Sequence, residues 1–380
     1  FTDAPIYSVE NAATGAWAAQ SVNLNTYMGN EIVYIAWKNT STDKNVLQIN
    51  NVKVAVSGPD AGITIAGETQ ENQYTQIPLR QITPLGANAT ITNTGGEVIN
   101  AIATVTVTKG TETVYTDSSA SFEIAVDANQ QVTFEGYTPI DEGIYTTTYS
   151  VAIQKTDIQT SNNTFTKNTE VTSNTYARDN NTVTINIGVL NTTGAYFGQQ
   201  YDILESQDIS SVTFAIVNTD EVLTGLQVRA TVWDMADGVP NAIIATTDFV
   251  TVTEAGIGIY TANIIGEAFA LATGQYVIAI EQPTAVNGLP DGAILNIAAT
   301  ETIFTPGTTW VTWPENENEG WSNNEDFGFN VSYIIRPNFR DVMYPQVLFE
   351  DDFDGSGPGL SGWTLYDVDG NTPNDEVSEF

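Results

Sequence analysis

The stretch Leu226-Gln227-Val228-Arg229-Ala230-Thr231-Val232 carries an apolar side chain at every second position and a polar one between. Successive side chains of a strand point to opposite faces, so this pattern places one face on a core and the other in water. The same period recurs at residues 52–56, 105–107, 145–153 and 183–189. No stretch of about twelve residues shows the helical period of 3.6. The sequence therefore predicts an all-β fold.

Turn residues separate these runs, as in Asn93-Thr94-Gly95-Gly96 and Ala236-Asp237-Gly238. Short alternating runs between such turns are typical of β-sandwiches, and we expect Ig-like and jelly-roll-like sandwiches in series. The expected pieces are 1–59, 60–166, 167–337 and 338–380, with an Asn- and Thr-rich connector at 160–174. The two end pieces are too short for a core of their own, because domains of about 40 residues usually need a staple such as a disulfide.

The composition excludes several classes of function. The 380 residues include 11 Lys or Arg and 46 Asp or Glu, which gives a net charge of −35, and there is no Cys or His. Disulfides, thiolate metal sites and imidazole catalysis are therefore excluded. Nucleic-acid binding is disfavoured because phosphate contacts need Lys and Arg. No apolar run reaches the roughly 20 residues of a membrane span. Nothing marks a catalytic carboxylate pair, so we expect a protein that is not an enzyme.

Both end pieces carry motifs of a known family. Trp17 precedes residues 22–29, which read Val-Asn-Leu-Asn-Thr-Tyr-Met-Gly, and these precede Tyr-Ile-Ala-Trp at 34–37 and Leu-Gln-Ile-Asn-Asn-Val-Lys-Val at 47–54. This order resembles the C-terminal half of a choice-of-anchor J domain, the family that includes the cleaved adhesin domains of gingipains. Residues 349–354, Phe-Glu-Asp-Asp-Phe-Asp, and 362–371, Gly-Trp-Thr-Leu-Tyr-Asp-Val-Asp-Gly-Asn, resemble the start of the same domain.

The resemblance implies partial anchor J sandwiches at both ends, an Ig-like module at 60–166, and a larger sandwich at 167–337. Proteins of this architecture are typically exported by the type IX secretion system of Bacteroidota. They act as adhesins or as accessory regions of surface enzymes. The resemblance therefore implies a non-catalytic adhesin or structural stalk, extracellular or on the outer surface of a Gram-negative cell. Its partners would be cell-surface or matrix glycans or proteins. The alternative is a carbohydrate-binding accessory region of a secreted enzyme.

The incomplete end domains would need completion from outside the two segments. We expect this chain to be part of a longer polypeptide whose flanking domains complete both sandwiches. The alternative is that neighbouring copies complete each other by strand addition, which would produce a head-to-tail filament.

The C-terminal segment contains a candidate calcium site. Asp367, Asp369 and Asn371 alternate like the first three ligands of an oxygen-rich Ca²⁺ loop, although a solvated Asp-Gly turn is the alternative. Glu350 and Asp352 either join that structural cation or form the outward face of a strand that resists edge pairing. In the family's closing strand an Asp pair stands where this chain has Asn at 50 and 51, which weakens the case for a cation there.

Two further sets of residues can each be interpreted as a functional site or as an ordinary part of the fold. Asp234 and Asp237, beside a glycine, either hold a cation or belong to a hairpin turn. Trp310, Trp313 and Trp321 lie close together in the sequence, among Asn and Glu residues. Aromatic faces stack on sugars, so one interpretation of these three is a glycan platform, although Trp residues of a β-sandwich more often pack in its interior. The alternative is packing in the core or at strand ends.

Overall fold

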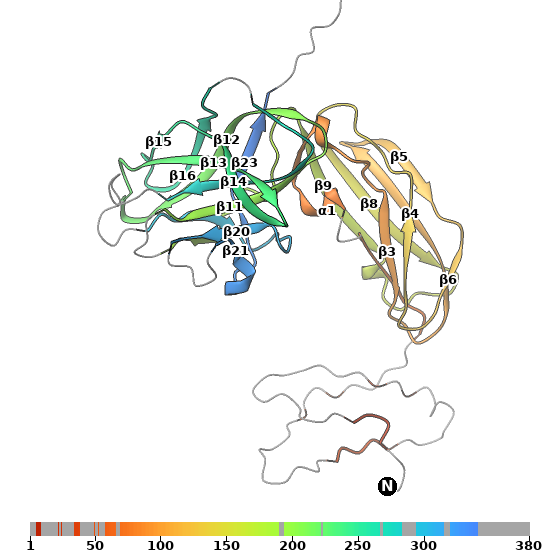
Figure 1. Cartoon of the computed structure of the whole chain (residues 1–380). Helices are drawn as coiled ribbons and strands as arrows, with labels where there is room; N and C mark the ends of the chain where they lie inside the picture. Colours follow the sequence, from red (N-terminus) through yellow and green to blue (C-terminus); the bar gives the residue numbers. More distant parts are fainter. Residues whose placement is uncertain are drawn as a thin grey trace, which may run out of the picture. The chain divides into compact units, whose positions relative to one another are not determined.

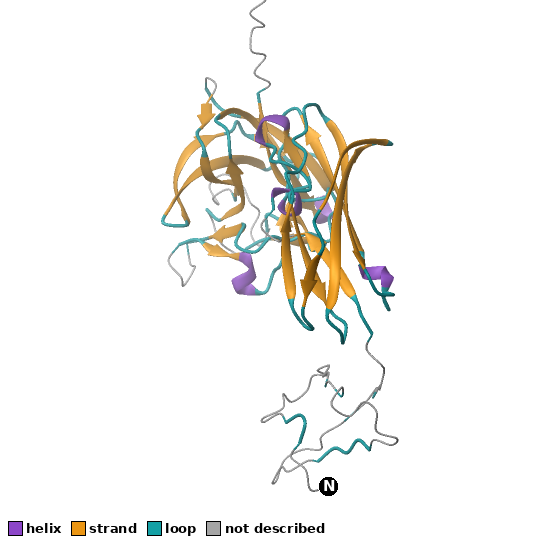
Figure 2. Ribbon diagram, turned by 90° about the vertical axis from the view of Figure 1, so that its right-hand side faces the viewer, coloured by secondary structure: helices purple, strands orange, loops and turns teal. Residues whose placement is uncertain are grey.

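The computed structural model describes residues 5–8, 22, 24, 34–38, 49, 52, 58–65, 69–189, 194–221, 223–266, 269–282, 294–314 and 320–340. Strands dominate the described part of the chain (Figure 2), which confirms the predicted all-β class. Helical structure there is confined to short turns: α1 (Gln70–Gln73), η2 (Leu79–Gln81), η3 (Thr160–Asn162), η4 (Thr219–Glu221) and η6 (Asn324–Phe327). No described helix is long and apolar enough to cross a membrane.

The first sandwich packs a three-stranded sheet on a six-stranded sheet around an apolar core (Figure 1). The smaller sheet has the order β1 (Ala61–Ile65), β3 (Asn88–Asn93), β7 (Asn129–Thr133). The larger has the order β2 (Gln76–Pro78), β9 (Thr164–Thr172), β8 (Gly143–Ile153), β4 (Ile99–Lys109), β5 (Glu112–Ser118), with β6 (Phe122–Ile124) paired to β4. On β8 alternate residues such as Tyr145, Tyr149 and Val151 are buried, as their spacing predicts.

The outer face of the six-stranded sheet carries rows of hydroxyl side chains that run across β5, β4, β8 and β9. One row is Thr116, Thr106, Thr148, Thr166, and the next is Ser118, Thr104, Ser150, Thr164. Neighbours within a row contact each other, since the Thr104 and Ser118 hydroxyls lie 2.8 Å apart and those of Thr106 and Thr116 lie 3.2 Å apart. These rows contain no charged and no aromatic residue. We call them the hydroxyl face.

The second sandwich consists of two seven-stranded sheets. One contains β10 (Ile185–Ile187), β19 (Ile297–Thr300), β12 (Gln207–Asn218) and β16 (Gly256–Asn263), with β17 (Phe269–Leu271), β22 (Ser332–Tyr333) and β23 (Ile335–Phe339) added. The other has the order β14 (Val239–Thr246), β13 (Gln227–Ala236), β18 (Gly274–Glu281), β11 (Tyr196–Ile203), β20 (Thr309–Thr312), β21 (Ser322–Asn323), with β15 (Val250–Thr251) beside β13. Side chains such as Phe197, Val232 and Ile280 fill the space between the two sheets.

Two expected boundaries fall inside strands. β9 crosses the boundary expected at 166, and it pairs with β8 from Gly143 to Ser150, so the first sandwich extends to Thr172. The Asn- and Thr-rich tract at 160–174 is therefore mostly a strand, whose exposed positions are all polar and whose inward positions hold Phe165, Lys167, Thr169 and Val171. β23 crosses the boundary expected at 337 in the same way, and Phe339 is buried in the core of the second sandwich. The expected anchor J segments lie largely outside the described residues.

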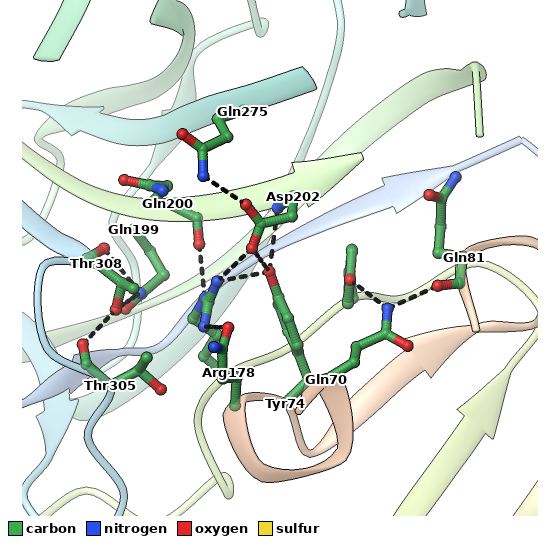
Figure 3. A network of polar contacts seen from close by, with 12 residues as sticks. Gln70, Tyr74, Gln81, Arg178, Gln199, Gln200, Asp202, Gln275, Thr305 and Thr308 are labelled. Carbon is green, nitrogen blue, oxygen red and sulfur yellow. Dashed lines mark hydrogen bonds and ion pairs between the residues drawn. The ribbon is translucent and has the colours of Figure 1, made fainter. Parts of the chain in front are cut away.

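A buried arginine joins the two sandwiches. Arg178, whose side chain is 1% exposed, donates from Nε to the Gln200 carbonyl at 2.7 Å and from Nη2 to Asp202 at 3.0 Å (Figure 3). Its guanidinium also lies 3.9 Å from the centre of the Tyr74 ring, and the Tyr74 hydroxyl donates to Asp202 at 2.7 Å. Tyr74 follows α1 of the first sandwich but packs in the apolar core of the second. The junction is therefore a shared core rather than an open linker.

Candidate functional site

Strand register brings aromatic side chains to the outer face of the sheet that contains β11. Tyr196 on β11 lies opposite Glu281 on β18 and Thr312 on β20. Trp233 on β13 lies opposite Val277 on β18, two positions from Ala279 on the same face. The intervening residues, such as Phe197, point into the core of the sandwich. Both aromatic side chains are half-buried, so part of each remains open to solvent.

Small residues form the floor beneath these rings. Gly198 lies opposite Ala279 and, on its other side, Trp310. A Cβ added to Gly198 would lie 2.4 Å from Val277 Cγ1 and 3.6 Å from Trp321 Cζ3. The absence of a side chain at this position therefore leaves room for Val277, and Trp321 lies at ordinary contact distance above it. A glycine in a strand often marks such a close approach.

The rings on this floor contact one another at steep angles. The Trp233 and Trp321 rings have centroids 5.1 Å apart and an interplanar angle of 80°. Tyr196 and Trp233 are 5.2 Å apart at 79°, and Tyr196 and Trp321 are 6.1 Å apart at 44°. Edge-to-face contacts of this kind stabilise aromatic clusters by about 0.5–1.5 kcal/mol per pair beyond area burial. The cluster is therefore held in place before any ligand binds.

An open pocket of about 480 Å³ adjoins the cluster. Its lining consists of Gly194, Tyr196, Trp233, Thr312, Trp313, Pro314, Gly320 and Trp321. None of these residues is charged, although the whole chain has a net charge of −35. Mostly apolar walls with a few polar groups are typical of small-molecule sites. We call this feature the aromatic pocket.

The polar atoms of the cluster are largely satisfied within the protein. The Trp233 indole N–H donates to Thr231 at 2.8 Å, and the Trp310 indole N–H donates to the Gln200 side chain at 3.1 Å. Burial raises the pKa of Tyr196, and the nearby Glu281 carboxylate raises it further while Arg229 opposes this. Tyr196 is therefore a neutral phenol at ordinary pH and can donate or accept a hydrogen bond.

The structure divides the three predicted tryptophans. Trp313 and Trp321 line the aromatic pocket, and Trp313 also packs on Phe327 with ring centroids 5.6 Å apart. Trp310 is 7% exposed and packs on Val277 and Ala279 beside the cluster, so it supports the pocket without lining it.

The sequence analysis missed Tyr196, Trp233 and Gly198. The signal for Trp233 was present in the stretch 226–232, because its alternation continues to place residue 233 on the outward face. A large aromatic at an outward strand position indicates a contact surface, since solvent-facing positions are usually polar. That β13, β11 and β20 lie in one sheet follows only from the topology.

Asp234 and Asp237 are the candidate cation ligands that the structure describes. The Asp234 carboxylate accepts hydrogen bonds from the Ala242 N–H at 2.7 Å and from the Asn241 amide at 3.2 Å. Asp237 and Gly238 have φ of 52° and 81° between β13 and β14, which is the geometry of a tight hairpin turn. The hairpin reading is therefore correct for this pair. No group of three or more acidic residues in the described part of the chain is arranged to hold a metal ion.

The predicted calcium ligands Asp367, Asp369, Asn371, Glu350 and Asp352 lie outside the described residues. The calcium site stays a prediction from the sequence.

Comparison with known proteins gives no assignment. No protein-family model and no curated protein matches the chain. One similar solved structure is described as "Structural basis for the promiscuous specificity of the carbohydrate-binding modules from the beta-sandwich super family". The similarity covers 64% of this chain and 96% of that chain, with 10% sequence identity and a TM-score of 0.19. At that TM-score the likeness has no bearing on function.

Proposed function

We propose that this chain is a non-catalytic glycan-binding segment of a secreted or cell-surface adhesin, and that the aromatic pocket is its binding site. The observation that carries the proposal is the grouping of Tyr196, Trp233, Trp313 and Trp321 around an open pocket of about 480 Å³. The C–H faces of sugar rings are apolar and stack on aromatic rings, while their hydroxyls need a few polar groups at the edge. Tyr196 and Thr312 supply such groups.

Binding without catalysis fits the residues that line the pocket. Glycoside hydrolysis generally needs two carboxyl groups on either side of the scissile bond. The described residues that line the pocket include no Asp or Glu. The nearest acidic side chain in the strand register, Glu281, is paired with Arg229 on β13.

The adhesin context is supported by the arrangement of sandwiches in series and by the family resemblance of the two ends. A shared buried core at the junction holds one sandwich against the next, because Tyr74 of the first packs with Tyr176 and Tyr201. Weak sugar sites on many such segments would act together through multivalency. A carbohydrate-binding accessory region of a secreted enzyme would use the same pocket, and the domains that flank the segment distinguish the two.

The test is a glycan array probed with the full chain, the variant Trp321→Ala and the control pair Thr106→Ala with Thr148→Ala on the hydroxyl face. We expect the wild type and the control to bind the same glycans, and Trp321→Ala to lose them. Trp321 is half-buried on a surface, so the variant should fold, and circular dichroism verifies this. Equal binding by the wild type and Trp321→Ala would refute the assignment of the site.

A further inference from the structure

We infer that the aromatic pocket takes the terminal residue of a neutral glycan, and not the internal residues of a continuous chain or an acidic sugar. This inference rests on the proposed function and narrows it to a class of ligand. Two independent observations carry it: the angles between the rings, and the lack of charged side chains among the described residues that line the pocket.

The ring angles decide how a sugar chain can enter. An extended, flat chain stacks successive sugar units on aromatic faces that lie nearly in one plane. Here the Trp233 and Trp321 planes meet at 80°, and the Tyr196 and Trp233 planes meet at 79°. A sugar that stacks on one of these rings therefore meets the next ring as a wall. The chain can continue on one side only.

The size of the pocket agrees with a terminal unit. Small-molecule sites usually have volumes of about 300–1,000 Å³. At about 480 Å³ this pocket lies in the lower half of that range. The walls are fixed by packing, because Trp321 lies over the Gly198 floor and its ring contacts both Tyr196 and Trp233.

The charge distribution selects against acidic sugars. Recognition of a carboxylate or sulfate generally uses Arg or Lys. Neither occurs among the lining residues that the structure describes. The cation nearest in the strand register, Arg229, donates to the Glu281 carboxylate and lies 5.0 Å from the centre of the Phe249 ring, so it is already engaged. The net charge of −35 adds a long-range repulsion of anions.

Calorimetric titration of the full chain tests the inference with defined probes. The probes are disaccharides and hexasaccharides of the gluco-, manno-, galacto- and xylo-series. For the series that binds, two capped hexasaccharides are added, one O-methylated at the non-reducing end and one reduced to the alditol at the other end. A final probe carries a uronic acid in place of the terminal neutral sugar.

We expect the disaccharide and the hexasaccharide to bind with affinities within about threefold of each other, since only the terminal unit contacts the rings. One of the two capped hexasaccharides should lose at least about tenfold in affinity, and so should the uronic acid probe. Trp233→Phe, which keeps a flat ring, should retain this preference, whereas Trp233→Ala should lose binding.

Three results would overturn the inference while leaving the proposed function intact. They are equal binding of both capped hexasaccharides, an affinity that rises steadily with chain length, and a preference for the uronic acid probe. Absence of binding to every probe and to the array would refute the proposed function itself. The two failures are therefore distinguishable.

Discussion

The outer faces of two sheets in this chain contrast sharply. The hydroxyl face of the first sandwich is built from Thr and Ser rows on β4, β5, β8 and β9, with no aromatic residue in those rows. The corresponding face of the second sandwich carries Tyr196, Trp233 and Trp321 over a floor of small residues. Both faces cover an apolar core, so burial does not explain the difference. Water is a good neighbour for Thr hydroxyls but a poor one for indole rings, so the aromatic face is the better candidate for a contact surface.

The pocket depends on a strand that also reaches the junction. β11 carries Tyr196 and Gly198 at the aromatic pocket, and it carries Asp202 at the junction with the first sandwich. Gln200 links the two regions. Its carbonyl accepts a hydrogen bond from Arg178 at the junction, and its side chain accepts one from Trp310 beside the pocket. Substitution of Arg178 therefore tests the junction end of β11, and substitution of Gly198 tests its pocket end.

The largest effect is expected from Arg178→Ala. Removal of this guanidinium leaves the Gln200 carbonyl, Tyr74 and Asp202 without their charged partner, and removing one member of a buried ion pair costs about 3–5 kcal/mol of unfolding free energy. We expect about 3 kcal/mol, because the Asp202 side chain keeps 30% exposure to solvent. Urea unfolding measures the change.

The matched control for Arg178 is Arg80→Ala. Arg80 also bridges the two sandwiches through Glu205, but their side chains are 24% and 55% exposed. Pairs at that exposure usually contribute about 0–1 kcal/mol. Similar losses for both variants would contradict the view that the junction is a shared core.

A smaller effect is expected from Gly198→Ala. The added Cβ would approach Val277 Cγ1 to 2.4 Å, so Val277 must move, and overpacking of this kind costs about 1–3 kcal/mol. The same shift should disturb Trp321 and weaken sugar binding. Thermal unfolding and calorimetric titration measure the two effects. Gly62→Ala on β1, where an added Cβ would come no closer than 3.4 Å to the Asn162 side chain, separates the effect of crowding from that of losing a strand glycine. Unchanged stability and binding in Gly198→Ala would contradict the role of the small floor.

The third test concerns the core beneath the hydroxyl face. Burial raises the pKa of Glu71 above its ordinary value of 4.5, while hydrogen bonds from Tyr149, Gly86 and Thr147 oppose the rise. A carboxyl with a raised pKa in the folded state favours the fold when protonated. Its contribution is complete below pH 4.5 and is lost as the pH rises through the raised pKa.

Glu71→Gln should therefore flatten the decline in stability that begins above pH 4.5 and leave sugar binding unchanged. Denaturant midpoints at a series of pH values provide the measurement. A variant that keeps the wild-type pH dependence would show that Glu71 is not its source.

The smallest effect is expected from ionic strength. The described lining of the aromatic pocket carries no charge, so raising salt from about 0.05 to 0.5 M should leave glycan affinity within about twofold. Calorimetric titration in the two buffers measures the glycan affinity. A large loss at high salt would place charged groups in the binding site.

Much of the fold was predictable from the sequence, because alternation survives wherever one strand face is buried. The stretch 226–232 forms the strand that its pattern predicts, within β13. The boundary at 166 was misplaced because Thr and Asn at the outward positions of β9 read as a connector, although Phe165 and Val171 lie between them on the inward face. Composition shows only how polar a segment is. Whether the segment forms a strand depends on whether its apolar residues recur at every second position.

The site was only partly predictable. Trp313 and Trp321 were identified from their proximity in the sequence, but Trp233 lies about 80 residues earlier, and only the order of strands in the sheet brings it to them. The junction shows the same limit, since Arg178 and Tyr74 are separated by 104 positions. Contacts of this kind depend on topology, which alternation does not specify.

The most direct test of the central claim is to observe which face holds the sugar. Methyl-labelled threonine and indole N–H signals can be recorded by nuclear magnetic resonance while the best-binding glycan from the array is added. We predict that the indole signals of Trp233, Trp313 and Trp321 shift together and saturate, while the methyl signals of Thr106 and Thr148 stay in place. Shifts centred on the hydroxyl face, with the indole signals unmoved, would contradict the account.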